Sequence, residues 1–400
     1  MAVLLRDLCE RVKDYGMELI AGRNGLGRPV RWVHMVENQE IANFLEGQEI
    51  AFATGIGLQT QEDLCGLVKS VYSNDASGFV VNIGPYIHQI SPETVRFCND
   101  HDLPLFRVPW SVHMAQIMHV FSLAITMSEK HNMELAAALR NAIECPDREE
   151  MYLDYLEQSG FNRGWNYCVA ALEAHDKTTR SCLESVVDLC IAQNGWKAAM
   201  LELNGRLVIV FAQCGSVVVR DMVMAILNAA RARGVDTDRV FVGVGKVTKS
   251  ARCIRKSCGQ AMRLERLQFL RGNGAVPALY DESGVDKILL GVEDVSILDD
   301  YYADSIAPLV NYDKAHDSDL VDTLRTYLKF NGSVKETAES MFVHRNTVNY
   351  KLGKIETVLG VDLGTYSVRE FLSIGLQVDE ILQCMRLGNE GYQGSRSAAP

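Results

Sequence analysis

The stretch from Leu320 to Leu363, LVDTLRTYLKFNGSVKETAESMFVHRNTVNYKLGKIETVLGVDL, decides the fold of the C-terminal region. Its apolar residues recur at helical spacing in three blocks, which predicts three short helices. Asn331-Gly332 ends the first helix, because glycine adopts the left-handed cap conformation easily. Ser333 and Glu336 have capping-box spacing at the start of the second. The pattern is typical of a helix-turn-helix.

Each predicted helix has an apolar inner face. These faces comprise Leu320, Leu324, Tyr327 and Leu328, then Val334, Ala338 and Met341, then Val348, Leu352, Ile355 and Leu359. The small Ala338 lets the third helix cross closely over the second. Phe342-Val343-His344 forms the turn, and the third helix is predicted to run from Arg345 to Gly360.

The outer side of this third helix carries basic and amide side chains before its first acid, Glu356. A helix fits the DNA major groove, where arginine pairs with guanine and asparagine with adenine, while lysine, threonine and tyrosine bind phosphates. We predict DNA contacts for Lys335, His344, Arg345, Asn346, Thr347, Asn349, Tyr350, Lys351 and Lys354. Base contacts are expected from Arg345, Asn346, Asn349 and Tyr350, and phosphate contacts from Lys335, Thr347, Lys351 and Lys354. The alternative is a three-helix cluster whose basic residues are merely solvated.

The region from Leu4 to Pro109 alternates short apolar runs with helical stretches. VRWVHMVEN, EIAFATG, GFVVNIG and LPLFRVP are predicted strands, and Gln61–Ser73 and Pro92–His101 are predicted helices. This order predicts an α/β domain. Four residues lie at the ends of predicted strands, where ligand pockets often form: His34, Glu37, Thr54 and Gly55. A role in a turn or in the core is the alternative for each.

Between Pro109 and Pro146 there is no glycine or proline. Mostly apolar positions step there alternately by four and three: Met114, Met118, Phe121, Ile125, Ser128, Asn132, Leu135, Leu139 and Ala142. This rhythm is compatible with a dimeric coiled coil in which Asn132 fixes the register, or with one amphipathic helix packed on its own domain. From Trp165 to Gly272 a second α/β domain is predicted. Within it, Asn204-Gly205 between two alternating apolar runs indicates a tight β-hairpin.

The charge, the cysteine spacing and the apolar runs of the chain argue against several classes of protein. The formal net charge of −11 argues against general coating of a polyanion, so any DNA contact must be local. The eleven cysteines lack CxxC spacing, which indicates reduced thiols in a cytosol and no metal site. The N-terminus lacks the apolar run of a signal peptide, and Met114–Met127 is too short and too polar to span a membrane.

The stretch quoted first closely resembles the C-terminal DNA-binding domain of the PucR-type regulators, which include purine-catabolism and carbohydrate-diacid regulators. The preceding IAPLVNYDKAHDSDL is similar to their lead-in. Where the family usually continues HRNT as xRYRL, this chain has VHRNTVNYKL, with Asn349 and Lys351 in place of two arginines. We therefore expect an operator that differs from those of better-known relatives.

PVRWVHMVENQEIANFLEGQEIAFATG resembles the PucR-type sensor domain, which implies recognition of a small metabolite. The middle domain resembles the degenerate GGDEF-like domain of the same regulators. Cyclases use acids at a hairpin to hold metal ions. Here the hairpin is LELNGRLVIV, with Glu202 as its acid and Arg206 opposite in charge. We predict no catalytic residues, no metal and no cofactor, with a role in dimerisation or signal relay by analogy.

The resulting prediction is an α/β (α+β) multidomain transcription regulator of the cytoplasm that controls catabolic genes and is not an enzyme. Its segments are a sensor at 1–130, a helical linker at 131–150, a GGDEF-like domain at 151–275, a connector at 276–316, an all-α helix-turn-helix domain at 317–385 and a flexible tail at 386–400. Expected partners are double-stranded DNA, a small-molecule effector and a second copy of the chain in a homodimer or higher oligomer, with RNA polymerase a further candidate and no membrane. The rivals are an active nucleotide cyclase or hydrolase with a DNA-binding tail, and a protein-binding adaptor.

Overall fold

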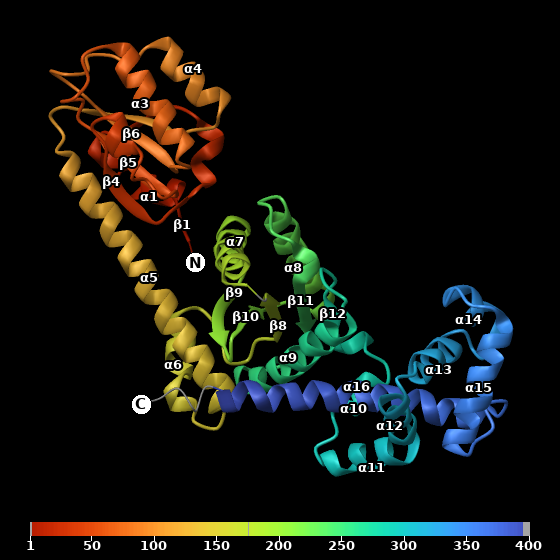
Figure 1. Cartoon of the computed structure of the whole chain (residues 1–400). Helices are drawn as coiled ribbons and strands as arrows, with labels where there is room; N and C mark the ends of the chain where they lie inside the picture. Colours follow the sequence, from red (N-terminus) through yellow and green to blue (C-terminus); the bar gives the residue numbers. More distant parts are fainter. Residues whose placement is uncertain (1, 175, 395–400) are drawn as a thin grey trace. The chain divides into compact units, whose positions relative to one another are not determined.

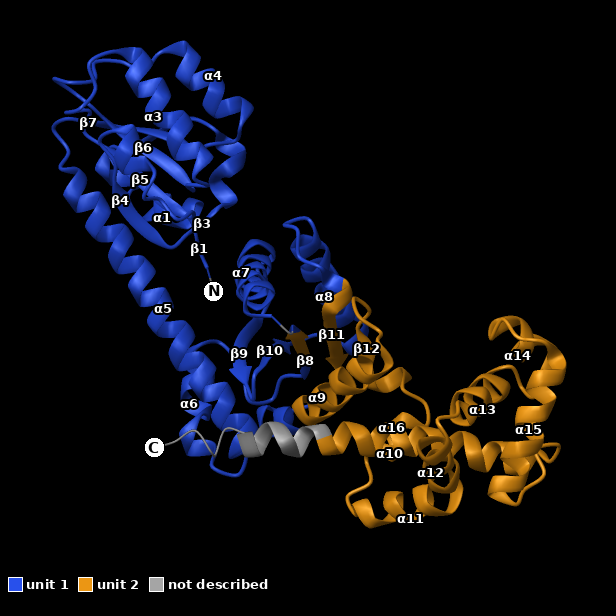
Figure 2. Cartoon of the chain, viewed as in Figure 1, with its two compact units in different colours: residues 1–169, 174–237, 247–255 blue, residues 170–173, 238–246, 256–400 orange. Residues whose placement is uncertain are grey.

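The computed structural model describes residues 2–174 and 176–394. The chain divides into two compact units (Figure 2). Unit 1 comprises residues 1–169, 174–237 and 247–255, and unit 2 comprises residues 170–173, 238–246 and 256–400. The mixed α/β fold class predicted from the sequence is confirmed, with helices and sheets upstream and helices alone in the C-terminal part.

The N-terminal domain is built on a five-stranded sheet with the order β2-β7-β6-β5-β4. Its strands are β2 (Glu18–Ala21), β4 (Trp32–Met35), β5 (Glu49–Ala53), β6 (Gly78–Ile83) and β7 (Leu105–Pro109). Neighbours from β4 to β7 run parallel, and β2 runs antiparallel to β7. All four strands predicted in this region are present, because each is an apolar run bounded by turn residues.

Helices cover both faces of this sheet (Figure 1). They are α1 (Leu5–Arg11), α2 (Gln39–Ala42), α3 (Gln61–Ser73) and α4 (Pro92–Asp100), and a short pair of strands, β1 (Val3–Leu4) and β3 (Pro29–Val30), lies beside them. Alternate residues of a strand point to opposite faces. Ala51 and Ala53 of β5 therefore join the core under α3 and α4, while Ile50 and Phe52 join the core under α1.

The 31-residue helix α5 (Met114–Glu144) runs through the boundary predicted at residue 130. Phe121 and Ile125 are buried in the core of the N-terminal domain, and Leu135 and Leu139 are buried farther along, where the helix contacts β9 and α6. These residues are positions of the predicted coiled-coil seam. These four seam positions are therefore covered by this chain itself, whereas Ser128 and Asn132 between them are half-buried.

The middle region contains a second five-stranded sheet, of order β12-β11-β8-β10-β9. Its elements are α6 (Leu153–Gln158), β8 (Tyr167–Ala174), α7 (Lys177–Asn194), β9 (Ala198–Leu203), β10 (Arg206–Ala212), α8 (Ser216–Arg231), β11 (Val240–Val244), α9 (Ile254–Arg271) and β12 (Ala278–Leu279). The predicted hairpin is confirmed: β9 pairs antiparallel with β10, and Asn204 and Gly205 both have positive φ, at 50° and 77°. A two-residue type I′ turn needs that conformation at both positions.

Helices make up the rest of unit 2. They are α10 (Asp286–Leu289), α11 (Val295–Ser305), α12 (Ala307–His316), α13 (Leu320–Lys329), α14 (Val334–Ser340), α15 (Arg345–Leu359) and α16 (Tyr366–Gly394). Short 3-10 helices lie at Lys13–Tyr15, Arg23–Gly27, Glu149–Met151, Thr237–Arg239, Ala251–Cys253 and Tyr280–Glu282. Residues 386–394, predicted to belong to a flexible tail, continue α16, and 395–400 lie outside the described residues. Among the described helices, none combines the length and apolarity that a membrane crossing requires.

Candidate DNA-binding site

Three short helices, α13, α14 and α15, pack around one apolar core in the C-terminal part of unit 2. Leu324, Val348 and Ile355 are fully buried there, and Ala338 is 6% exposed at the contact between α14 and α15. The inner faces predicted from helical spacing thus meet, except at Met341, which is half-buried and not among the residues of this core. The small Ala338 side chain allows the close crossing, since a larger residue would push the two helices apart.

The turn between α14 and α15 is held by the backbone. Phe342 has φ 53°, a left-handed conformation, and Val343 N–H donates to the Ala338 carbonyl at 3.1 Å. Val343 packs against the core. The Phe342 ring, in contrast, is 95% exposed. This turn aims the N-terminal end of α15 away from the core.

The N-terminal half of α15 presents its polar side chains to solvent. Arg345, Asn346, Thr347, Asn349 and Tyr350 are all exposed, and Tyr350 is 76% exposed. In the same stretch Val348 is fully buried, so the polar face and the buried face lie on opposite sides of one helix. The structure therefore brings the four predicted base-contacting residues together on one accessible surface.

His344 is the N-cap of α15. Its Nδ1 accepts the backbone N–H of Asn346 at 3.3 Å, which satisfies one of the free donors at the helix start. An Nδ1 that accepts this bond carries no proton, so the remaining ring proton lies on Nε2. His344 thus offers an outward N–H donor of the kind that phosphate oxygens accept.

Two of the predicted phosphate contacts are engaged within the domain. Lys351 Nζ lies 2.6 Å from the carboxylate of Asp319, and the Lys351 side chain is 18% exposed. Lys354 Nζ lies 5.1 Å from the ring centroid of Tyr312, within cation-π range. Lys335, on α14, is exposed. The sequence-based set therefore separates into side chains that are presented to solvent and two lysines that pack back on α12 and α13.

Asp313 is a structural residue of this site that the sequence analysis missed. Its carboxylate accepts the Ser318 hydroxyl at 2.6 Å and the backbone N–H groups of Leu320 and Val321 at 3.0 and 2.8 Å. It caps α13 from the preceding helix, α12, across a turn in which Asp317 has positive φ. The spacing of seven and eight residues is not that of a local N-cap motif, so a search for such motifs does not find it.

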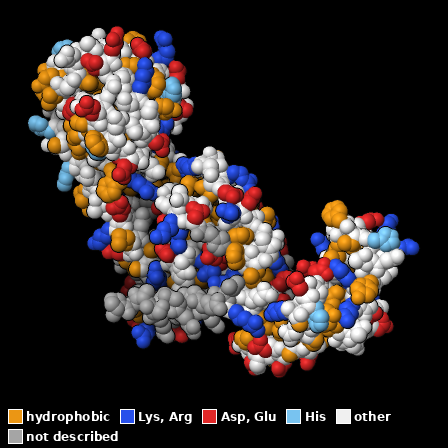
Figure 3. Space-filling view, viewed as in Figure 1, with side chains coloured by type: hydrophobic (Ala, Val, Ile, Leu, Met, Phe, Trp, Pro, Cys, Tyr) orange, Lys and Arg blue, Asp and Glu red, His pale blue; other side chains and the backbone are white. Residues whose placement is uncertain are grey.

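Basic and acidic side chains are interspersed over the C-terminal helices on the face that Figure 3 shows. The sequence from Asp319 to Glu370 contains seven of each. With acids and bases equal in number, any DNA contact must come from one local face, as the net charge of the chain also requires.

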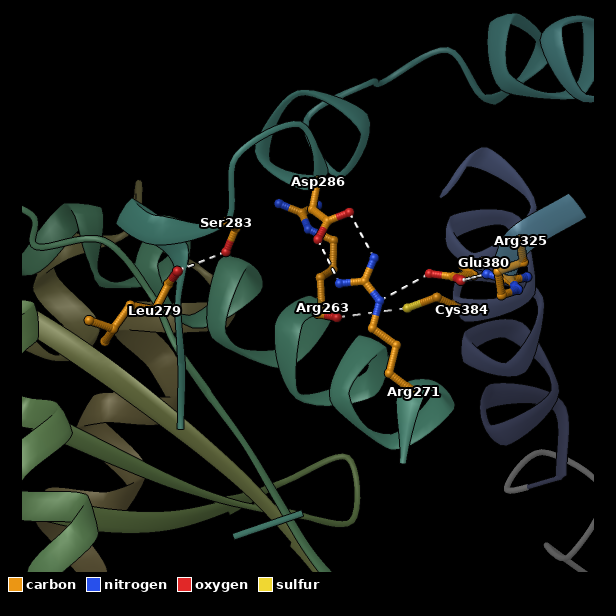
Figure 4. Close-up of polar contacts among 8 residues, drawn as sticks. All are labelled: Arg263, Arg271, Leu279, Ser283, Asp286, Arg325, Glu380 and Cys384. Carbon is orange, nitrogen blue, oxygen red and sulfur yellow. Dashed lines mark hydrogen bonds and ion pairs between the residues drawn. The ribbon is translucent and has the colours of Figure 1, made fainter. Parts of the chain in front are cut away.

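The long helix α16 belongs to two cores. Leu372 and Leu376 pack with α13 and α15, while Val378, Ile381 and Leu382 pack with α9 and α10. Glu380 lies within the second group, between Val378 and Ile381, and pairs with Arg325 of α13 and, at 3.0 Å, with Nε of Arg271 of α9 (Figure 4). Arg271 also binds Asp286 of α10 through two bonds of 2.7 and 3.0 Å. These charges neutralise one another in a partly buried chain of ion pairs that joins four helices.

Three of the four predicted effector residues meet at the carboxyl edge of the N-terminal sheet. The Glu37 carboxylate accepts Thr54 N–H and Oγ1 at 2.9 and 2.7 Å, and Gly55 N–H at 3.0 Å. His34 lies on β4, paired with Ala51. The clustered residues bond to one another, so they fix the loop after β5, which is the turn role that the sequence analysis kept as the alternative.

Two exposed aromatic residues that the sequence analysis missed lie at the same edge. Tyr86 follows β6 and is 49% exposed, and Trp110 follows β7 and is 45% exposed. Their ring centroids are 5.7 Å apart in an edge-to-face arrangement. A Cβ at Gly84 would lie 2.7 Å from the Trp110 side chain, so glycine makes room for the indole. Exposed aromatic rings beside the ends of parallel strands are typical of ligand-binding edges.

Glu202, the acid of the β9–β10 hairpin, is paired with a base. Its Oε1 lies 3.0 Å from Nη2 of Arg180 on α7. No group of three or more His, Cys, Asp or Glu side chains that could hold a metal ion occurs among the described residues. A two-metal cyclase centre needs several free carboxylates, and this hairpin offers one that is already paired.

Three family models match the chain. The purine catabolism regulatory protein-like family matches residues 8–125, a GGDEF-like domain matches residues 146–267, and the PucR C-terminal helix-turn-helix domain matches residues 320–378. The last match contains α13, α14 and α15 in full. The chain therefore has the domains of the PucR-type regulators, in the same order as the three matches.

The curated relatives of this PucR-type chain are named as regulators. It is 26% identical over 140 residues to the proline-responsive transcriptional activator PutR of Bacillus subtilis, covering 35% of this chain and 34% of that protein. It is 27% identical over 150 residues to the carbohydrate diacid regulator of Escherichia coli, covering 36% and 35%. It is 34% identical over 94 residues to the purine catabolism regulatory protein of Bacillus subtilis, covering 24% and 17%. The matches thus span about a third or less of these relatives.

Among solved structures, a regulator of polyketide synthase expression from Bifidobacterium adolescentis aligns with 62% of this chain and 97% of its own length. Its identity of 16% and TM-score of 0.29 are too low to support a conclusion about the fold. The family matches include the residues predicted from the sequence. The first of them contains all four predicted effector residues, and the second contains Glu202.

Proposed function

We propose that this PucR-type chain is a transcription regulator that binds operator DNA through α15 and controls catabolic genes in response to a small metabolite. The observation that carries the proposal is the exposed polar face of α15, from Arg345 to Tyr350, on a three-helix core. A helix held in this way fits the major groove, where Arg345 pairs with guanine and Asn346 or Asn349 with adenine.

Catabolic control is inferred from the relatives. Their names refer to proline, to carbohydrate diacids and to the catabolism of purines, and all three are small molecules that a cell can break down. The effector of this chain would bind in the N-terminal domain at the edge that carries Glu37, Tyr86 and Trp110. Because its target is chromosomal DNA, the protein would work in the bacterial cytoplasm.

DNA binding by two copies would supply the affinity that one small helix-turn-helix lacks. Two α15 helices placed one or more helical turns apart would contact a repeated operator. The effector must favour one arrangement of the two copies by a difference in free energy, since equal affinity for both would shift nothing.

Fluorescence anisotropy with the full chain tests this proposal. The labelled duplex is one selected from random sequences for binding to the chain. The chain is titrated into this duplex at salt concentrations from about 50 to 200 mM, in the presence of a competitor duplex of scrambled sequence. We expect specific binding that weakens steeply with salt. Binding that shows no preference for the selected duplex, or no affinity for DNA at all, would overturn it and favour the protein-binding adaptor.

We further propose that the chain is not an enzyme, because Glu202 is paired with Arg180 at 3.0 Å. Incubation with GTP and Mg²⁺ should leave the nucleotide unchanged. Turnover that disappears in Glu202→Ala and persists in Glu157→Ala, an acid of α6 outside the hairpin, would establish the cyclase or hydrolase instead.

A further inference from the structure

A hollow of about 500 Å³ opens in unit 2 between α9, β12, the turn that leads into α10, and α16. Small-molecule pockets have volumes in this range, and one water takes up only ~30 Å³ of liquid. Leu264 and Leu267 of α9 form an apolar floor and are 1% and 0% exposed. This α9–α16 hollow is separate from the aromatic edge of the N-terminal domain and from α15.

One side chain in the α9–α16 hollow lacks a hydrogen-bond donor. Gln377 of α16 lines the hollow, and its Oε1 is buried without a partner among the described residues. A buried acceptor in this state costs free energy, so native proteins usually satisfy it. The donor for Gln377 must therefore come from the molecule that fills the hollow.

The charges in the hollow argue against an ionic ligand. Arg271 is the one cation among the described lining residues, and it lies between Asp286 and Glu380 and bonds to both (Figure 4). An anion would have to displace one of these carboxylates and would also meet Glu282, another lining residue. A cation would compete with Arg271 for Asp286. An uncharged ligand leaves the ion pairs intact.

A second amide in the hollow indicates what kind of uncharged ligand fits. Gln268 of α9 lines the same hollow as Gln377. A glutamine amide offers one acceptor oxygen and an NH₂ donor, so it is complementary to a group that has both a donor and an acceptor. Carboxamides and lactams carry an N–H beside a carbonyl and have no charge. The apolar floor suits the rest of such a molecule.

We infer that the α9–α16 hollow binds a small uncharged amide, a carboxamide or a lactam, whose N–H donates to Oε1 of Gln377. A further hollow of about 440 Å³ shares Val285 and Gln377 with it and is lined by Leu328 of α13. The bound amide would therefore lie close to the helices of the DNA-binding domain. This site does not depend on the effector site proposed in the N-terminal domain.

Ligand-observed NMR titrations of the full chain test the inference. The probes are three uncharged amides: nicotinamide, 2-pyrrolidinone and uracil. Nicotinate is the matched control compound, because it replaces the carboxamide of nicotinamide with a carboxylate on the same ring. We expect nicotinamide to bind with a Kd about tenfold or more below that of nicotinate, since the anion lacks the donor and carries a charge.

Gln377→Leu removes the amide at similar size and should weaken amide binding about tenfold. It should melt no lower than wild type, because the substitution also removes a buried acceptor without a partner. The matched control variant is Gln61→Leu at the start of α3 in unit 1. Oε1 of Gln61 is likewise buried without a partner, and this variant should bind the amides as wild type does.

Four results would overturn the inference. They are no binding of any of the three amides to wild-type chain, equal binding of nicotinamide and nicotinate, unchanged amide binding in Gln377→Leu, and a loss of binding in Gln61→Leu alone. The last result would place the amide in the N-terminal domain. The proposed DNA binding is measured without the probes, so it stands or falls separately.

Discussion

Replacing Asp319 with asparagine removes the carboxylate that holds Lys351 inside the C-terminal domain. Lys351 Nζ lies 2.6 Å from this carboxylate, and the two side chains are 18% and 54% exposed, respectively. Among the described residues, the Asp319 side chain makes no capping hydrogen bond at the start of α13. Asparagine should therefore leave the helix intact while releasing the lysine.

The size of the effect follows from the ion pair. Two unit charges 2.6 Å apart attract by about 332/(80 × 2.6), or ~1.6 kcal/mol, in water. Side-chain ordering and screening reduce exposed pairs to a net ~0.2–1 kcal/mol. Because the Lys351 side chain is mostly buried, we take the upper end of this range, about 1 kcal/mol, for the pair with Asp319. About 1 kcal/mol corresponds to roughly fivefold, so Asp319→Asn should bind DNA up to about fivefold more tightly.

Released Lys351 should also add a phosphate contact. The slope of log K against log salt should then steepen by about 0.9. Anisotropy titrations of the full chain between about 50 and 200 mM salt measure both quantities. Lys351→Gln in the Asp319→Asn background is the control, and it should abolish the gain. A gain that survives this control would come from the lost acid alone, and an unchanged Kd and slope in Asp319→Asn would refute the competition between carboxylate and phosphate.

Further outcomes follow from other contacts. Arg345→Ala should cost ~1–3 kcal/mol of binding and relax sequence preference, and uniform weakening on all duplexes would make Arg345 a phosphate contact. Val348→Ala, at a fully buried position, should destabilise the C-terminal domain by ~2 kcal/mol in urea unfolding. Burial raises the pKa of Cys98 and Cys258 to about 12. Iodoacetamide at pH 8 should therefore label exposed Cys253 well before either, as peptide mass spectrometry would show.

Local patterns were enough to predict most elements. The three helices from Leu320 to Leu359 and four of the five strands of the N-terminal sheet are each set by the spacing of apolar residues and by the residues that end them. The fifth strand, β2 (Glu18–Ala21), was not predicted. The Asn204-Gly205 turn is confirmed for the same reason, since its positive φ values are a property of two adjacent residues.

Contacts between distant residues could not be predicted in this way. Lys351 pairs with Asp319 and Lys354 packs on Tyr312 because α15 crosses α12 and α13, and helical spacing does not fix that crossing. What covers the apolar face of α5 could not be predicted for the same reason. Periodicity shows that Phe121 and Leu139 share an apolar face, but it does not say whether a second copy or the same chain covers it.

At the C-terminal end, the tail predicted from glycine-rich composition overlaps the last helix. Residues 386–394 contain glycines and were expected to be mobile, yet α16 continues through them. The preceding turns of this helix are anchored by Val378, Ile381 and Leu382 in the core with α9 and α10. Tertiary packing of that kind supports helix that the intrinsic propensity of the following residues would not.

The same packing restricts how α13 can move relative to α9, and so bears on the proposed response to an effector. Because α16 contributes to both cores, α13 cannot shift relative to α9 without disturbing one core or breaking a pair of Glu380 with Arg271 or Arg325. Coupling between sites in regulators typically amounts to ~1–3 kcal/mol, which is the range that one partly buried ion pair can supply. The change in operator affinity on adding effector can be measured for wild type, Glu380→Gln, Arg271→Gln and the double variant. This double-mutant cycle should therefore show a coupling free energy of about this size. If the effects of the two substitutions on this change simply add, the ion pair between Glu380 and Arg271 takes no part in the response to effector.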